Sequence, residues 1–218
     1  MSDTGNFGFG QMFPEDYAND MAVTSFIARQ MIAMLDTVKL VQVLAVYGGG
    51  VGPAGTVDVL PLVNQVDGNF NPVPHGKVAG IPWSRIQGGA NAVICDPQVG
   101  DIGYVVCSDR DISNAVARNG MLGGTSLLGI GIDPASWRNF SICDGVYVGG
   151  CLNVAPNQYL IFTATGVRLV DSYGNSVAMG PVGITMSDFS GNVIETSSAG
   201  VAVTATNFTW NGQVVQVV

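Results

Sequence analysis

The residues best suited to bond-breaking chemistry are three acids near the C-terminus, Asp171, Asp188 and Glu195. A glycoside hydrolase needs two carboxylates, about 5–9.5 Å apart, on either side of the scissile bond. Asp171 and Asp188 occupy equivalent places in two similar segments, so they could stack near each other. Each is also followed by a Gly-Asn pair, where an aspartate caps the backbone amides of a turn. We therefore expect turn aspartates and no enzyme, with a glycan hydrolase or depolymerase as the alternative.

No metal or cofactor site is expected from the histidine and cysteine pattern. His75 is the only histidine, and no cysteine belongs to a CxxC pair. A structural zinc site typically draws its ligands from such closely spaced pairs. We expect free, buried thiols in a protein made in a reducing cytoplasm, at Cys95, Cys107, Cys143 and Cys151.

Phosphate and nucleic-acid binding are also disfavoured. The glycine-rich stretch 48–52 lacks the Gly-Lys-Ser/Thr ending and the following helix of a phosphate loop, so it predicts a wide hairpin tip. The net charge of −8 is the wrong sign for a nucleic-acid partner. Charged residues make up only 11% of the chain, against roughly 25% in a typical domain. So little surface charge favours burial in an assembly.

The acids belong to an internal repeat of 17 residues. Its lead glycines are Gly166, Gly183 and Gly200, and Asp171 and Asp188 keep the same step. Apolar and polar residues alternate after each glycine, which predicts strands with one apolar face, and the Gly-Asn pairs predict turns. The apolar face comprises Val167, Leu169, Val177, Ile184, Met186, Ile194, Val201 and Val203.

So narrow a ribbon cannot bury its own apolar face, and two and a half repeats are few for a single-chain solenoid. We expect several copies to wind around a shared apolar axis, with these eight residues as the core of the assembly. The alternative is an ordinary β-sandwich with a chance repeat.

Upstream of the repeat, the pattern predicts an arm, a barrel and a connector. Residues 1–38 form the arm, with a helix from Pro14 to about Thr37 that either packs on the next domain or docks onto another protein. Residues 39–110 read as an OB-type barrel of five strands, and residues 111–137 as a glycine-rich connector with a short helix at its start. The predicted barrel strands cover residues 40–47, 56–63, 76–83, 92–95 and 102–107. The docking residues of the arm are Phe26, Ile27, Met31 and Met34.

This order of parts resembles the central spike proteins of contractile-tailed bacteriophages. The motifs that carry the resemblance are individually loose but occur in a specific order, over residues 39–205. They are Val57-Asp58-Val59-Leu60-Pro61-Leu62-Val63, Asp96-Pro97-Gln98-Val99-Gly100-Asp101-Ile102-Gly103, Ser108-Asp109-Arg110-Asp111-Ile112 and Arg138-Asn139-Phe140-Ser141-Ile142-Cys143-Asp144-Gly145.

The resemblance implies a mainly β homotrimer, in which residues 138–218 of three chains intertwine as a triple-stranded β-helix. The barrels would join a baseplate hub protein, and sheath contraction would drive the spike through the host outer membrane. The family's His-x-His iron site is not carried over, because a second histidine is absent. A separate spike-tip protein is therefore expected as a partner.

The expected location is the virion baseplate, after synthesis in the host cytoplasm. In keeping with this, the sequence contains no apolar run of 18 residues and no secretory signal at Met1. A receptor-binding tailspike is a further alternative, for which the exposed aromatics would be Tyr173, Phe189, Phe208 and Trp210.

Overall fold

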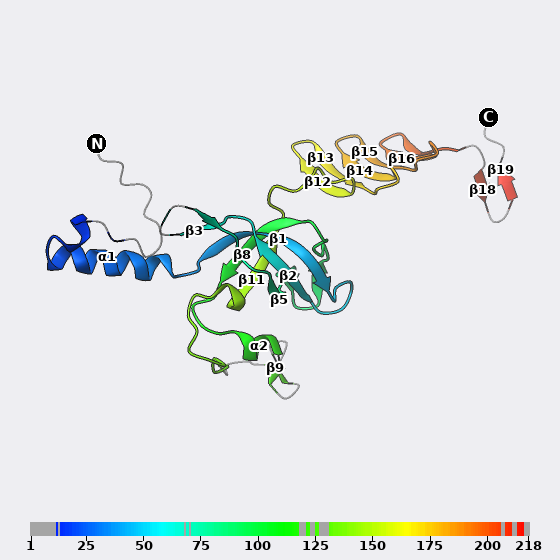
Figure 1. The fold of residues 1–218 in the computed structure, drawn as a ribbon. Coiled ribbons are helices and arrows are strands. Elements are labelled where there is room, and N and C mark those ends of the chain that lie inside the picture. Colours follow the sequence, from blue (N-terminus) through cyan, green and yellow to red (C-terminus); the bar gives the residue numbers. More distant parts are fainter. Residues whose placement is uncertain are drawn as a thin grey trace. The chain divides into compact units, whose positions relative to one another are not determined.

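A computed structural model of the chain describes residues 12, 14–67, 69, 71–117, 121–122, 125–126, 131–205, 208–210 and 213–215. The fold is mainly β, as predicted. It divides into two compact units, Met1–Asn153 and Val154–Val218, which are described separately (Figure 1). Among the described residues, no helix combines the length and the apolar character needed to cross a membrane.

The described part of the arm contains one α-helix. A 3-10 turn, η1 (Pro14–Tyr17), precedes α1 (Asp20–Ala33), so the helix begins later than the predicted Pro14. The reason is its N-cap, since the Asn19 side chain accepts a hydrogen bond of 3.0 Å from the Ala22 N–H. No residue of α1 is buried.

The exit of the arm is fixed by Asp36. Its N–H donates to the Phe140 carbonyl (2.9 Å), and its carboxylate accepts from the Ile142 N–H (3.0 Å). Lys39 forms an ion pair with the same carboxylate at 2.9 Å.

The first unit is built on a curled five-stranded sheet, here called the half-barrel. Its strand order is β11-β8-β1-β2-β5, and every neighbouring pair is antiparallel. An isolated bridge between Trp83 and Tyr147 links its two edges, supported by a 3.0 Å hydrogen bond from the Ser84 N–H to the Tyr147 carbonyl. The strands are β1 (Val38–Tyr47), β2 (Thr56–Pro61), β5 (Val78–Pro82), β8 (Ile102–Cys107) and β11 (Gly145–Gly149).

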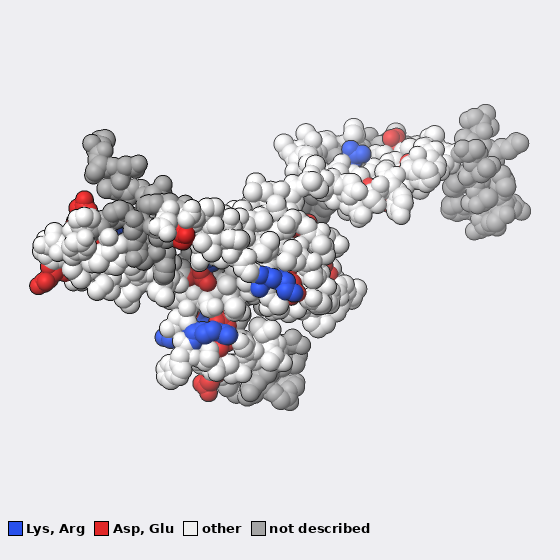
Figure 2. All heavy atoms as spheres, viewed as in Figure 1, with Lys and Arg blue, Asp and Glu red and all other residues white. Residues whose placement is uncertain are grey.

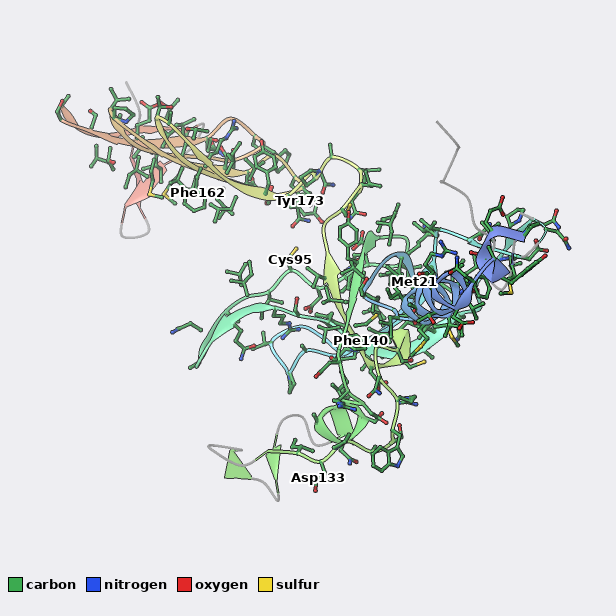
Figure 3. The ribbon with its side chains drawn as sticks, turned by 90° about the vertical axis from the view of Figure 1, so that its left-hand side faces the viewer. Met21, Cys95, Asp133, Phe140, Phe162 and Tyr173 are labelled. Atoms are coloured by element: carbon green, nitrogen blue, oxygen red, sulfur yellow. The ribbon has the colours of Figure 1, made fainter. Side chains whose placement is uncertain are left out.

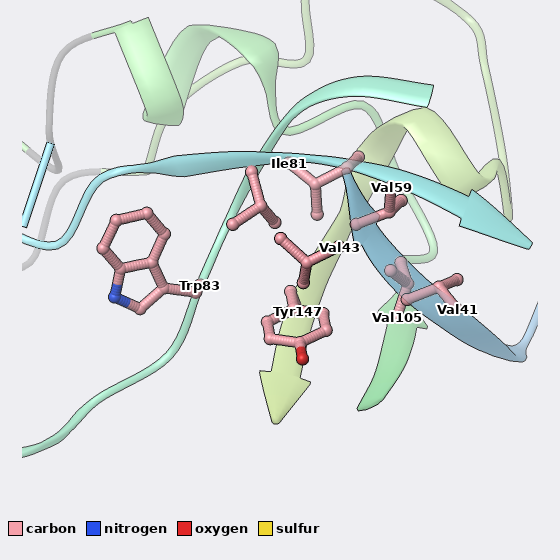
Figure 4. Close-up of a cluster of buried hydrophobic side chains, with 8 residues drawn as sticks. Val41, Val43, Val59, Ile81, Trp83, Val105 and Tyr147 are labelled. Carbon is pink, nitrogen blue, oxygen red and sulfur yellow. The ribbon is translucent and has the colours of Figure 1, made fainter. Parts of the chain in front are cut away.

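The core of the half-barrel is aliphatic with two aromatic side chains. Alternate residues of the strands point inward, which is why the β-branched positions of β1, β2 and β8 meet there (Figure 4). Its members are Val41, Val43, Val57, Val59, Ile81, Trp83, Val105 and Tyr147.

The predicted strand over residues 92–95 was wrong as a barrel strand. Residues Asn91–Val93 form β7, which pairs only with β6 (Ile86–Gly88) in a separate hairpin. Its place in the half-barrel is taken by β11, which the sequence assigned to the segment starting at residue 138. Tyr147 of β11 is almost fully buried (1% exposed) and completes the core. Its core partners on β1 and β2 are distant in sequence, so local patterns could not reveal this strand.

Smaller elements complete the first unit. The short helix α2 (Ser113–Ala117) lies at the start of the connector, and the 3-10 turn η2 (Ile142–Asp144) follows it. Two further hairpins join β3 (Gln65–Val66) to β4 (Pro72–Val73) and β9 (Met121–Leu122) to β10 (Thr125–Ser126).

The second unit is a six-stranded antiparallel meander, here called the ribbon. Each strand pairs with the next one along the same chain, so the ribbon is formed within a single chain, and the intertwining of three chains stays a prediction. A separate hairpin of β18 (Phe208–Trp210) and β19 (Gln213–Val215) follows it. The ribbon strands are β12 (Tyr159–Thr163), β13 (Gly166–Val170), β14 (Ser176–Gly180), β15 (Gly183–Ser187), β16 (Val193–Ser197) and β17 (Gly200–Thr204).

Candidate functional site

The 17-residue repeat corresponds to two strands and two different turns. A five-residue turn joins β13 to β14 and β15 to β16, whereas two-residue turns join β12 to β13, β14 to β15 and β16 to β17. All five-residue turns therefore lie along one edge of the ribbon and all two-residue turns along the other.

The five-residue turns are organised by the repeat aspartates. The Asp171 carboxylate accepts hydrogen bonds from the Tyr173 N–H (2.9 Å), the Asn175 N–H (2.9 Å) and the Asn175 side-chain amide (2.6 Å). The amide of Asn175 contributes most to holding the pKa of Asp171 below its ordinary value. This carboxylate is thus occupied by its own turn, as expected of a turn aspartate.

The second turn repeats this geometry. Asp188 accepts from the Ser190 N–H (2.9 Å), the Asn192 N–H (2.8 Å) and the Asn192 side-chain amide (2.6 Å). The carbonyl oxygen of the Asn175 side chain accepts a hydrogen bond from the Phe189 N–H at 3.1 Å, which links one five-residue turn to the next.

Two of the three lead glycines are required by close backbone approach. At Gly183, φ is +144°, and a Cβ would overlap the carbonyl oxygen of Thr196 on the neighbouring strand. Gly166 meets the carbonyl of Met179 in the same way. At Gly200 no atom lies within 4 Å of an added Cβ, and the positive φ of +125° alone favours glycine.

All eight residues predicted as the assembly core lie on one face of the ribbon, here called the apolar face. The register places them in two rows that run across the strands. The first row is Leu160, Leu169, Val177, Met186, Ile194 and Val203. The second row is Phe162, Val167, Met179, Ile184, Thr196 and Val201.

Within one chain this face is only partly covered. Leu169 is 53% exposed, Met186 48% and Val201 71%, and the labelled Phe162 stands out from the ribbon in Figure 3. An open apolar groove of about 600 Å³ runs along the first row beside the five-residue turns. Monomeric proteins rarely expose a continuous apolar surface of this extent, so the apolar face is the candidate functional site.

The opposite face of the ribbon mixes polar and small side chains with the larger side chains of Tyr159, Ile161, Val170 and Val193. Its middle row carries Arg168, Thr185 and Glu195, and the hydroxyls of Ser176 and Ser187 lie 2.8 Å apart on it. Figure 2 shows few charged side chains on the visible ribbon surface. The charged side chains of the ribbon strands thus lie on the opposite face, and the apolar face carries none.

No protein-family model matches the chain, and no curated protein is significantly similar to it.

Three of the predicted docking residues lie on α1, and the fourth, Met34, is its C-cap. Ile27, Met31 and Met34 are more than half exposed, and Phe26 is partly exposed. Apolar side chains without cover in the described part of the chain are consistent with a docking helix, but its partner stays a prediction.

The basic residues of the half-barrel are engaged with acids. Lys77 contacts the buried Asp58 at 2.9 Å, and Arg85 contacts Asp96 at 2.7 Å. Asp96 also accepts from the Gly50 N–H at 2.6 Å, so the glycine-rich loop is held by a carboxylate of the same chain. Burial opposes ionisation of Asp96, yet these partners keep its pKa below the ordinary value.

The cysteines do not match the expectation of buried thiols. Cys95 and Cys143 are exposed and Cys151 is partly buried, whereas Cys107 is partly buried because it packs against the edge of the core. Among the described residues, no three His, Cys, Asp or Glu side chains are grouped to hold a metal ion.

One cluster was missed from the sequence. Arg138 forms ion pairs with the buried carboxylates of Asp111 (3.2 Å) and Asp144 (2.9 Å). Nearby, Arg110 donates to the Asn139 side chain at 2.7 Å. The motifs 108–112 and 138–145 are therefore in direct contact, and only their complementary charges could have indicated this.

Proposed function

We propose that this chain is the subunit of a trimeric, non-enzymatic central spike at the baseplate of a contractile phage tail. The half-barrel, of OB type, would form the base of the spike and three ribbons its shaft. The observation that carries the proposal is the apolar face, which extends across all six strands of the ribbon and stays half-exposed in one chain.

The free energy available at this face is sufficient for assembly. Eight of its large apolar side chains are between 42% and 73% exposed. Burying the remainder would contribute on the order of 10 kcal/mol per chain. For three chains this gives about 30 kcal/mol, while two association steps cost roughly 4–15 kcal/mol each. The eight are Leu160, Phe162, Leu169, Met179, Ile184, Met186, Ile194 and Val201.

The width of the ribbon suits three copies. Strands of five residues are about 17 Å long. Three sheets of this width form a triangle whose sides lie about 5 Å from its axis, which is half the usual spacing of about 10 Å between packed sheets. Four sheets would leave a hollow, because their sides would lie about 8 Å from the axis.

The hydrogen bonding of the ribbon strands and the net charge of the chain both support a role in puncturing a membrane. Continuous hydrogen-bonded strands around a dry axis resist bending, and the ribbon carries few charges to desolvate in a membrane. Three chains of net charge −8 carry −24, which an anionic outer leaflet repels. The spike would therefore have to be pushed across the membrane by contraction of the sheath.

Two further partners complete the proposal. We infer that α1 and its C-cap, through Phe26, Ile27, Met31 and Met34, dock onto the baseplate hub. A separate tip protein would cap the far end of the shaft, since residues that could hold the family's tip iron are missing from the sequence.

The test is a charge placed on the apolar face. Met186→Asp and Leu169→Asp should convert the trimer to monomer in size-exclusion chromatography with light scattering, because three buried carboxylates would meet at the axis. Thr185→Asp is the matched control, since its side chain lies on the opposite face and the trimer should persist. Trimers that survive both apolar-face substitutions, or a monomeric wild-type protein, would contradict the proposal.

A further inference from the structure

Both edges of the ribbon end in exposed apolar side chains. On the edge of the five-residue turns, Tyr173 is 79% exposed and Phe189 is 76% exposed (Figure 3 labels Tyr173). On the edge of the two-residue turns, Val182 is 85% exposed, next to Pro181. Neither set belongs to the apolar face, so closing the axis of a trimer does not cover them.

The turns on the two edges occupy alternating levels along the direction in which the strands stack. The turn bearing Tyr173 lies between β13 and β14, and the turn bearing Phe189 lies between β15 and β16. The turn bearing Val182 lies between β14 and β15, midway between these two levels. Neighbouring strands are about 4.8 Å apart, so each step between levels is about 4.8 Å.

A three-fold rotation preserves these heights. In the proposed trimer, the three-fold axis runs along the direction in which the strands stack. At each corner, the edge of five-residue turns of one copy then meets the edge of two-residue turns of the next copy. Val182 of one copy lies at the same height as the midpoint between Tyr173 and Phe189 of its neighbour.

The aromatic pair is held in place for such a contact. The Asn175 side chain accepts from the Phe189 N–H at 3.1 Å, which ties the two turns together. The Cβ of Phe189 lies 3.9 Å from where a Cβ on Gly174 would stand, so this turn leans toward its neighbour.

We propose that Val182 of each copy packs onto Tyr173 and Phe189 of the next copy and closes the corners of the shaft. This inference rests on the proposed trimer and deepens it by naming a contact between unlike edges. Such a heterologous contact closes into a ring after three copies and needs no partner of another kind.

Cysteine cross-linking of the full chain tests the contact. All variants carry Cys95→Ser and Cys143→Ser to remove the exposed native thiols. Tyr173→Cys with Val182→Cys, or Phe189→Cys with Val182→Cys, should give a covalent trimer on a non-reducing gel after mild oxidation. The matched control combines Tyr173→Cys with Ala199→Cys, which lies three strand spacings higher, about 14 Å away. This exceeds the reach of a disulfide, roughly 7 Å between Cα atoms.

The outcomes separate the corner contact from the trimer itself. A trimer by light scattering that forms no covalent product, or cross-links equally in the control, overturns the corner contact alone. Dimers from Tyr173→Cys on its own would indicate contact between like edges and also overturn it. A wild-type protein that is monomeric overturns both proposals.

A second variant avoids dependence on disulfide geometry. Val182→Asp should raise the concentration at which the trimer dissociates by at least about tenfold, whereas Val182→Leu should leave it unchanged. An unchanged dissociation midpoint for Val182→Asp overturns the contact.

Discussion

At the scale of single residues, the aspartates of this chain act as structural acceptors. Asp171 and Asp188 cap identical turns in the ribbon, and Asp67 makes the same pattern of bonds with Asn69 and Asn71 in the β3–β4 hairpin of the first unit. A carboxylate that accepts several N–H bonds is stabilised in its charged form. The candidate acids are therefore committed to folding the chain, and their effect should appear in its stability.

Acid should destabilise the ribbon through these turns. The folded pKa of Asp171 and Asp188 lies below the ordinary value of 3.8, so their contribution is complete above that pH and is lost as the pH falls below it. The double substitution of both aspartates by asparagine should lower the melting temperature at pH 5, by about 2–4 °C. It should also weaken the further fall between pH 5 and pH 3. Calorimetry across this range gives the profile.

Glu195→Gln is the control for this profile. Glu195 is exposed within β16 of the same ribbon, away from the capped turns, so its substitution should leave the slope as in the wild-type protein. A double variant whose slope equals that of the wild-type protein would contradict the role of the turn aspartates.

At the scale of elements, the sequence predicts where strands and turns lie better than it predicts which strands pair with one another. Alternation after each lead glycine places eight apolar residues on one face, because side chains in a strand alternate strictly. Four of the five half-barrel strands were also predicted from residues near them in sequence. The fifth was wrong, because β8 pairs with β11, and nothing local indicates that Tyr147 meets Trp83.

The same limit applies to the site. Local alternation identifies the apolar face, but it does not reveal that Asp111 and Asp144 share Arg138, since these residues approach only through the tertiary fold. Likewise, cysteines could not be assigned as exposed without the strand order.

Replacing a lead glycine tests the hairpin geometry of the ribbon. Gly183→Ala should destabilise the ribbon by roughly 2–5 kcal/mol, because it combines an unfavourable φ with overlap on the Thr196 carbonyl. Gly191→Ala is matched to it, since φ is +86° there and no atom lies within 4 Å of the added Cβ. It should cost only about 1–2 kcal/mol. Equal losses in denaturant unfolding would indicate that strand contact plays no part.

At the scale of the whole molecule, the two units differ in how they are stabilised. The half-barrel has a closed core of eight buried side chains within one chain. The ribbon has no fully buried residue in its described part, and its apolar face is open. The first unit can therefore fold by itself, whereas the proposed shaft depends on other copies.

Unfolding should consequently occur in two steps. The transition of the ribbon should rise with protein concentration, since assembly stabilises it by mass action, while that of the half-barrel should not. Calorimetry at concentrations spanning about two decades measures both, and fluorescence of the buried Trp83 assigns the half-barrel step. A single transition that is independent of concentration would argue against an assembly held by the ribbon.

The constant length of the repeat fixes how much each copy adds to the length of the ribbon. Each 17-residue copy brings two strands, a capped turn and a tight turn, and so adds about 10 Å of length. Inserting or deleting whole copies would change the reach of the shaft in fixed increments without moving any side chain to the other face. Inserting a single residue within a strand would instead invert the faces beyond it. The length of the ribbon, and with it that of the proposed shaft, is thus set by the number of repeat copies.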